Sequence, residues 1–277
     1  MSSLYRQACS IALLVIGLAL DPGSARAADA DLYRATVVVS GQGETNRAIG
    51  LAQCLEDVLV KVSGDQRVIQ DPKVAALKAE AAAAVAGFQY RDRMSGIPIH
   101  DEQGSYDRPH DLTVAFEPAR IDAMLHALGR EAWLAPRPRI VAFVAVAGRK
   151  DRFALASDGP HDPDMRSALA SAADRVGLTV VLPTMAELAG SALNVEALPR
   201  TSLPVLDVAA HETGGDAALA GSLHWSDEAL GWIADWRLAF HGVAYQWRVQ
   251  GVGFDDAFRS GMRGAAQVLS GHGQPEG

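Results

Sequence analysis

The chain has 277 residues, of which 49% are hydrophobic and 21% are charged, and its formal net charge is −8. This length suits one large or two ordinary domains, and the composition is typical of a globular protein. Nucleic acids and anionic lipid surfaces bind clustered basic residues. The sequence holds no such cluster, so we expect neither as a partner.

The N-terminal segment has the features of a cleaved secretory signal. A positive residue, Arg6, precedes an apolar run over 11–20, which is well short of the roughly 20 residues of a membrane span. The small-x-small pattern that ends at Ala27 predicts cleavage between Ala27 and Ala28, with a retained anchor as the alternative. We therefore expect an exported, periplasmic protein with no membrane span after cleavage.

The mature chain is expected to form two α/β domains joined by a proline-containing linker. In the first domain, apolar spacing predicts a strand over 32–40, helices over 44–62 and 71–86, short strands over 88–90 and 112–116 around a polar loop, and a helix over 117–128. The predicted divisions are a signal peptide (1–27), an N-terminal domain (28–130), a linker (131–139), a C-terminal domain (140–270) and a flexible tail (271–277).

The second domain is predicted to combine buried strands with an antiparallel meander. A continuous apolar run over 140–147 indicates a strand that is buried on both faces. Four of the five tryptophans lie in the meander over 218–251, where strict alternation favours their burial in the core. The remaining elements are a helix over 162–176 capped by Asp162, a strand over 178–182, a short helix over 185–189, a loop over 192–204, a helix end or linker over 205–210, and a last helix that Asp255 caps.

These elements together predict an α+β or mixed α/β fold with two small domains. The second domain is expected to have a mixed sheet with a C-terminal three-stranded antiparallel meander and packed helices.

Motifs that carry chemistry are weak in this sequence. A Gly-x-Gly turn at 41–43 stands between a strand and a helix, as in dinucleotide-binding proteins, but Asn46 replaces the third glycine. The histidines lack the paired spacing of a zinc-binding helix. Cys54 lies on an apolar helix face, which favours an inert buried thiol over a reactive one. We therefore expect no catalytic, cofactor-binding or metal site.

Two features are candidates for an interaction surface. Trp133 stands among charges and prolines in the linker, and the polar loop between the two short strands carries Asp101, Glu102 and Asp107. A solvated acidic face is the simpler interpretation of the loop. An exposed aromatic such as Trp225 is the alternative, as one wall of a ligand groove.

Several segments resemble a known family of exported bacterial proteins. They are the stretch over 38–64 with its Val-Ser-Gly-Gln-Gly turn, Arg-Pro-Arg-Ile at 137–140, Ala-Leu-Ala-Gly at 218–221 and Gly-Trp-x-x-x-Trp at 231–236. They resemble the domain of unknown function DUF2066 over nearly the whole mature chain. The chain is more loosely similar to flagellar basal-body ring proteins and to the N-terminal domain of the Tol system's periplasmic protein. The resemblance implies a Gram-negative envelope protein and supplies no functional residues.

The export signal and the lack of a converging polar motif favour a non-enzymatic interaction or scaffold module of the cell envelope. Its partners would be envelope proteins. The alternative is a periplasmic protein that binds a small ligand or a glycan through exposed aromatics such as Trp133 or Trp225. An enzyme is the third hypothesis.

Overall fold

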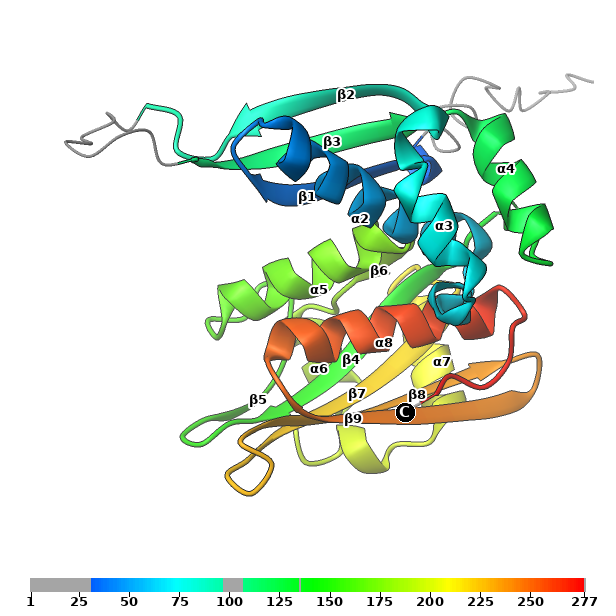
Figure 1. Ribbon diagram of the computed structural model, residues 1–277. Helices are drawn as coiled ribbons and strands as arrows, with labels where there is room; N and C mark the ends of the chain where they lie inside the picture. The colour runs from blue at the N-terminus through cyan, green and yellow to red at the C-terminus, as the bar shows by residue number, and fades with distance from the viewer. Residues whose placement is uncertain (1–30, 97–106, 135, 277) are drawn as a thin grey trace, which may run out of the picture.

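A computed structural model describes residues 31–96, 107–134 and 136–276, which contain two sheets and seven α-helices (Figure 1). The signal-like segment and both residues of its cleavage site lie outside the described residues. None of the helices in the described part of the chain has both the length and the apolar character of a membrane span. We call residues 31–134 the N-terminal unit and residues 136–276 the C-terminal unit.

The N-terminal unit is a three-stranded antiparallel sheet with helices on one face. Its strand order is β1-β3-β2. Along β1, Ala35, Val37 and Val39 are buried while the residues between them are exposed, so only one face of the sheet meets the core. The elements are β1 (Arg34–Ser40), α2 (Glu44–Ser63), η1 (Gln66–Gln70), α3 (Lys73–Ala79), η2 (Ala81–Ala84), β2 (Val85–Asp92), β3 (Pro109–Phe116) and α4 (Pro118–Ala127).

Helix α2 fills the core beneath this sheet. Its apolar stripe, with Leu55, Val58 and Leu59, has no exposed surface. Cys54 is also fully buried, as predicted, and burial together with the nearby Asp57 carboxylate raises the pKa of its thiol to about 12. The helix ends where Gly64 takes a left-handed conformation, with φ of 72°.

The C-terminal unit is a mixed six-stranded sheet that is covered by helices on both faces. The order is β5-β4-β7-β8-β9, and β6 pairs with β4 beside β5. Strands β6 and β7 run parallel to β4, and the other pairs are antiparallel. The elements are β4 (Arg139–Ala147), β5 (Arg152–Ala154), α5 (Pro163–Arg175), β6 (Thr179–Val181), α6 (Met185–Gly190), η3 (Leu198–Arg200), α7 (Leu203–Glu212), β7 (Ala217–Ser226), β8 (Gly231–Phe240), β9 (Val243–Val252) and α8 (Phe254–Leu269).

Strand β4 separates two cores. Val144 and its alternate neighbours pack with α5 and α8, whereas Phe143 and its neighbours pack with α6 and α7. This confirms the expectation of a strand buried on both faces. Figure 1 shows the resulting layers: α2 of the N-terminal unit lies between its own sheet and the helices α5 and α8 of the C-terminal unit.

The meander buries two of its tryptophans, not four. Trp236 and Trp247 face each other across β8 and β9 and are 0% and 5% exposed. Trp225 and Trp232 pair near the end of the β7–β8 hairpin, next to the last pair of the ladder, and are only partly buried. The prediction of four buried indoles is wrong. Alternation shows on which face of the sheet a side chain lies, but it does not show how much of that face a helix covers.

Three other predictions of local structure are wrong. The second helix ends at residue 79, because β2 begins at Val85 and pairs with β3. Neither Asp162 nor Asp255 caps a helix through its side chain: Asp162 takes a left-handed conformation at the start of α5, and Gly253 is the N-cap of α8. The first turn of α7 begins inside the segment that was predicted as a loop over 192–204, and strand β5 was not predicted.

Candidate functional site

The parallel strands of the C-terminal unit end at one edge of the sheet. The chain passes from β4 to β6 on one side of β4, and then to β7 on the other side. The connecting helices lie on opposite faces, α5 on one and α6 with α7 on the other. In open α/β sheets, ligands bind outside the carboxyl ends of strands where the strand order reverses in this way. The carboxyl ends of β4 and β7 are therefore the place to look for a site.

A groove of about 430 Å³ lies at this edge, and we call it the aromatic groove. Arg149 comes directly after β4, and Trp225 stands near the end of β7. The rings of Trp225 and Trp232 meet edge to face, with centroids 5.8 Å apart. The other aromatic and charged side chains of its lining are Phe153, Phe254, Lys150, Asp151 and Asp162.

Trp225 is half-buried, but its orientation is set by polar contacts. Its indole Nε1 donates a hydrogen bond to Oδ1 of Asp227 at 2.8 Å. Arg149 donates to the same oxygen, from Nε at 3.0 Å and Nη2 at 2.5 Å, and its Cζ lies 4.7 Å from the centroid of the Trp225 ring. The hydrogen bonds from Trp225 and Arg149 lower the pKa of the Asp227 carboxyl. The contacts among these three side chains thus hold the Trp225 ring in place as one wall of the aromatic groove before any ligand binds.

A second hollow, the apolar pocket, has a volume of about 410 Å³. It lies among β5, α6 and the segments that follow them. Phe153 lines both hollows, and its ring stacks on the His161 ring with centroids 4.9 Å apart and an angle of 17°. Most of the other lining side chains are small or aliphatic: Ala154, Ala156, Met185, Leu188, Leu193 and Val195.

Two of the predicted interaction residues, Trp133 and Asp107, lie in the described part of the chain, near opposite ends of α2. Trp133 is half-buried at the junction of the two units: its backbone N–H donates to the Val62 carbonyl at 2.8 Å, and the guanidinium of Arg137 lies 4.2 Å from its ring centroid. Asp107 is exposed and lies against Gly41, at the opposite end of the 20-residue helix α2. At 1.5 Å per residue that helix is about 30 Å long. Asp101 and Glu102, like Ala27 and Ala28, lie outside the described residues.

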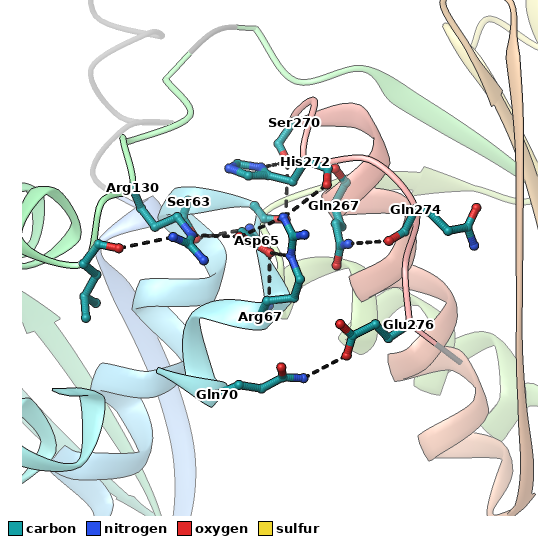
Figure 2. Close-up of polar contacts among 12 residues, drawn as sticks. Ser63, Asp65, Arg67, Gln70, Arg130, Gln267, Ser270, His272, Gln274 and Glu276 are labelled. Atoms are coloured by element: carbon teal, nitrogen blue, oxygen red, sulfur yellow. Dashed lines mark hydrogen bonds and ion pairs between the residues drawn. The ribbon is translucent and has the colours of Figure 1, made fainter. Parts of the chain in front are cut away.

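A buried carboxylate joins the N-terminal unit to the end of the chain (Figure 2). The side chain of Asp65 is fully buried and accepts hydrogen bonds from Nε of Arg67 at 2.9 Å and Nε of Arg130 at 2.8 Å. Arg67 also donates to the carbonyl of His272 at 3.1 Å. Burial raises the pKa of Asp65, but the hydrogen bonds from the two arginines outweigh it and leave that pKa below its usual value. We call this arrangement the Asp65 cluster.

A second cation, Arg137, also connects the two units. The guanidinium of Arg137 donates to the carbonyls of Lys61 at 2.6 Å, Val176 at 2.6 Å and Trp133 at 3.2 Å. Lys61 belongs to α2, and Val176 follows α5. The polar groups of the junction therefore bind one another. This arrangement is typical of a structural contact between two units and not of a catalytic site.

Within the described residues, no group of three or more His, Cys, Asp or Glu side chains is arranged to hold a metal ion. The Gly-x-Gly turn at 41–43 leads into α2 with Gly43 as its N-cap, and the side chain of Asn46 donates back to the Ser40 carbonyl.

The family comparison matches part of the chain. The model of a domain of unknown function, DUF8605, matches residues 27–134, which include the whole N-terminal unit. No curated protein matches the chain. The resemblance to DUF2066 is therefore wrong, and the looser resemblances to flagellar ring proteins and to the Tol-system protein are withdrawn with it. The longest segment that carried it is a strand, a glycine turn and a helix, and the shorter ones lie in or beside strands, features that unrelated α/β proteins share.

Sequence reasoning did not identify the aromatic groove. One signal was available: an apolar run over 140–147 is followed at once by the charged stretch Arg149-Lys150-Asp151-Arg152. Polar residues just after a buried parallel strand stand where ligands bind. Trp225 was named as an exposed aromatic, but its contacts with Arg149 join residues 76 positions apart that no local pattern connects.

Proposed function

We propose that the chain is an exported, non-enzymatic binding protein of the cell envelope, which holds a small ligand in the aromatic groove of its C-terminal unit. The observation that carries this proposal is the Trp225 indole, which is partly open to solvent yet held by Asp227 and Arg149 at the carboxyl end of β7. A wall that is already ordered loses little conformational freedom when a ligand binds.

The dimensions of the two hollows support the same proposal. Small-molecule sites measure roughly 300–1,000 Å³ and are lined by apolar and aromatic side chains with a few polar groups. The volumes of about 430 and 410 Å³ fall in this range. The envelope location rests on the signal-like pattern of the first 27 residues.

A melting-temperature screen tests ligand binding. A ligand that binds only the native state raises the melting temperature by mass action. We expect at least one member of a panel of envelope sugars, glycosides and peptides to stabilise the mature chain but not the Trp225→Ala variant. Leu230→Ala, at an 82% exposed position in the same hairpin, is the control and should respond as the unmodified chain does. An equal response of the Trp225 variant would contradict the proposal.

Location needs its own measurement. We expect cell fractionation to recover the protein from the periplasm, and N-terminal mass spectrometry of that material to begin at Ala28. Recovery of an intact N-terminus from another fraction would contradict the export part of the proposal while leaving the binding site untouched.

An envelope protein as the partner is a second candidate, in which the chain acts as a scaffold. It is supported by Val205 and Val208, which are 53% and 60% exposed and lie one turn apart on α7. A photo-crosslinker at position 208 in intact cells should capture one envelope protein, whereas the same group at the exposed Asp256 on α8, which covers the other face of the sheet, should capture less. Equal capture from both positions would count against a specific surface.

A further inference from the structure

We infer that the aromatic groove and the apolar pocket form one site for an uncharged amphiphile, with a hydroxyl-rich head in the groove and a hydrocarbon chain in the pocket. This inference rests on the ligand-binding function proposed above and adds the chemical class of the ligand.

The two hollows lie on either side of one short stretch of chain. Phe153 is a wall of both. His161, which stacks on Phe153, lines the apolar pocket, and the next residue, Asp162, lines the aromatic groove. A ligand that passes the edge of the Phe153 ring therefore reaches both hollows, and its two parts need not be far apart.

The charges of the aromatic groove favour an uncharged head. Arg149 and Lys150 line it together with Asp151 and Asp162, so donors and acceptors of both signs are present and nearly cancel. Arg149 is further neutralised by Asp227, which binds it at 2.5 Å. A phosphate or sulfate would meet two carboxylates without a surplus of cations, and a buried charge that is not matched is costly.

The aromatic rings favour a sugar ring over an ammonium group. The guanidinium of Arg149 already stands over the Trp225 ring, so the chain's own cation occupies this cation–π position. The faces of the remaining rings carry negative π-charge, against which the weakly positive C–H bonds of a sugar pack. The carboxylates of Asp151 and Asp162 accept hydrogen bonds from its hydroxyls.

The apolar pocket suits the hydrocarbon chain. Among the described residues that line it there is no Asp, Glu, Lys or Arg. A volume of about 410 Å³ is roughly 14 times the volume of about 30 Å³ that a water molecule occupies in the liquid, which leaves room for an octyl chain. The aliphatic side chains of Leu188 and Val195 offer the dry surface that a hydrocarbon chain prefers to water.

Calorimetric titration with matched probes tests the single site. The probes are octyl β-glucoside below its micelle concentration, its fragments methyl β-glucoside and 1-octanol, and the charged analogues octyl sulfate and octyltrimethylammonium. We expect octyl β-glucoside to bind at least tenfold more tightly than either fragment, because joining two parts of one site makes the second contact intramolecular. We also expect it to bind more tightly than both charged analogues.

Two variants assign the parts of the ligand. Ala189→Leu fills the apolar pocket from an exposed position on α6, and should reduce the affinity for octyl β-glucoside to that for methyl β-glucoside. Trp225→Ala removes the ring that Trp232 meets edge to face and releases the Arg149 guanidinium into the groove, so it should reduce the affinity for octyl β-glucoside towards that for 1-octanol. Ala186→Leu, exposed on the same helix but outside the pocket lining, is the control and should bind as the unmodified chain does.

The outcomes separate this inference from the proposed function. If octyl β-glucoside binds no more tightly than its better fragment, the two hollows are separate sites and the inference is overturned. Tighter binding of a charged analogue overturns the uncharged head. If none of these probes binds but another ligand stabilises the chain through Trp225, the inference fails and the proposed function stands. If no ligand of either kind binds, both fail.

Discussion

At the scale of single residues, the Asp65 carboxylate is the most constrained charge of the junction. It has no exposed side-chain surface, whereas its partners Arg67 and Arg130 are 36% and 27% exposed. Removal of one member of a buried ion pair leaves the others without a partner, which costs more than the pair contributes.

We expect Asp65→Ala to lower the free energy of unfolding by about 3 kcal/mol, because two guanidinium groups lose their shared acceptor. Urea denaturation followed by circular dichroism measures this change. Asp256→Ala, which breaks the exposed pair with Arg259 on α8, is the control and should change stability by less than about 1 kcal/mol. Equal effects of the two substitutions would show that the Asp65 cluster contributes no more than a surface pair.

The pH dependence of stability follows from the same residues. Burial lowers the pKa of His272, and the nearby Asp65 opposes that shift only in part. The unfolded state therefore binds the imidazole proton more tightly, so the contribution of His272 is present above its unfolded pKa of about 6.5 and is lost as the pH falls. The lowered pKa of Asp65 has the same sign in a more acidic range, below about pH 4.

We therefore expect the free energy of unfolding to fall between pH 7.5 and pH 5, and His272→Asn to remove most of that slope. Urea titrations at several pH values measure it. The raised pKa of Asp57, whose burial disfavours its charge, acts in the opposite direction, so the comparison is made in an Asp57→Asn background. An unchanged slope in the variant would assign the pH dependence to other groups.

At the scale of elements, small residues allow α8 to lie close to the meander. Gly221 of β7 and Gly261 of α8 contact the ring of Trp236 from two sides, and a Cβ at Gly261 would stand 2.6 Å from that ring. Gly264, one turn further along α8, leaves the same kind of space for the ring of Trp247. The Trp247 indole donates to the carbonyl of Ser260 at 3.1 Å, which ties the strand to the helix.

We expect Gly261→Ala to destabilise the protein by about 2 kcal/mol, because the added methyl group overpacks a fully buried indole. Alanine is the better helix former by about 1 kcal/mol, so propensity alone predicts the opposite sign. Gly190→Ala in α6, where a Cβ meets nothing within 4 Å, is the matched control and should be neutral or stabilising. Thermal unfolding of both variants shows whether packing or helix propensity determines the change in stability.

The sequence predicted long, periodic elements better than short ones. Helix α2 and strand β4 were predicted almost to the residue, because α2 carries a clear helical period over 20 residues and the 9 residues of β4 contain a continuous apolar run. The alanine-rich segment at 81–86 has high helix propensity, yet its end pairs with β3, since strand pairing overrides local preference. Strand β5 has three residues, too few for a pattern, and the proline in the first turn of α7 was interpreted as part of a loop.

The candidate site was harder to predict than the fold. Its walls come from the end of β4, the β5 segment, the β7–β8 hairpin and the start of α8, which only the strand order brings together. Trp133 shows the same limit of sequence-based prediction in the opposite direction. Its charged surroundings in the sequence favoured an exposed surface, but Arg137, four residues later, places its ring in the junction.

At the scale of the whole molecule, Arg137 connects the two units, each of which is built on its own sheet. It belongs to the predicted linker over 131–139 and binds carbonyls of both units. Lysine at this position has one compact ammonium group in place of a planar fork, so it cannot reach the same acceptors together.

We expect Arg137→Ala to destabilise the junction by about 3 kcal/mol, since hydrogen bonds to a charged donor contribute about 1.5–3 kcal/mol each and part of that is recovered by water. We expect the two units then to unfold in separate steps, which would also support the predicted division at 131–139. Four of the five tryptophans lie in the C-terminal unit, so in a Trp133→Phe background tryptophan fluorescence reports that unit, and far-ultraviolet circular dichroism reports both. Arg137→Lys should be intermediate. A single cooperative transition in the alanine variant would show that the remaining contacts suffice to couple the units.

The Asp65 cluster also sets the order in which the molecule is completed during its synthesis. Arg67 and the His272 carbonyl that it binds are separated by 205 positions in the chain, and Gln70 contacts Glu276 near the last residue. At translation rates of about 5–20 residues per second, roughly 10–40 s pass between the emergence of these partners. Asp65, Arg67 and Arg130 all belong to the first half and can pair during that interval. The segment around His272 can contact them only after it has emerged, so we expect this contact to form later than the contacts of Arg137 with Lys61 and Val176.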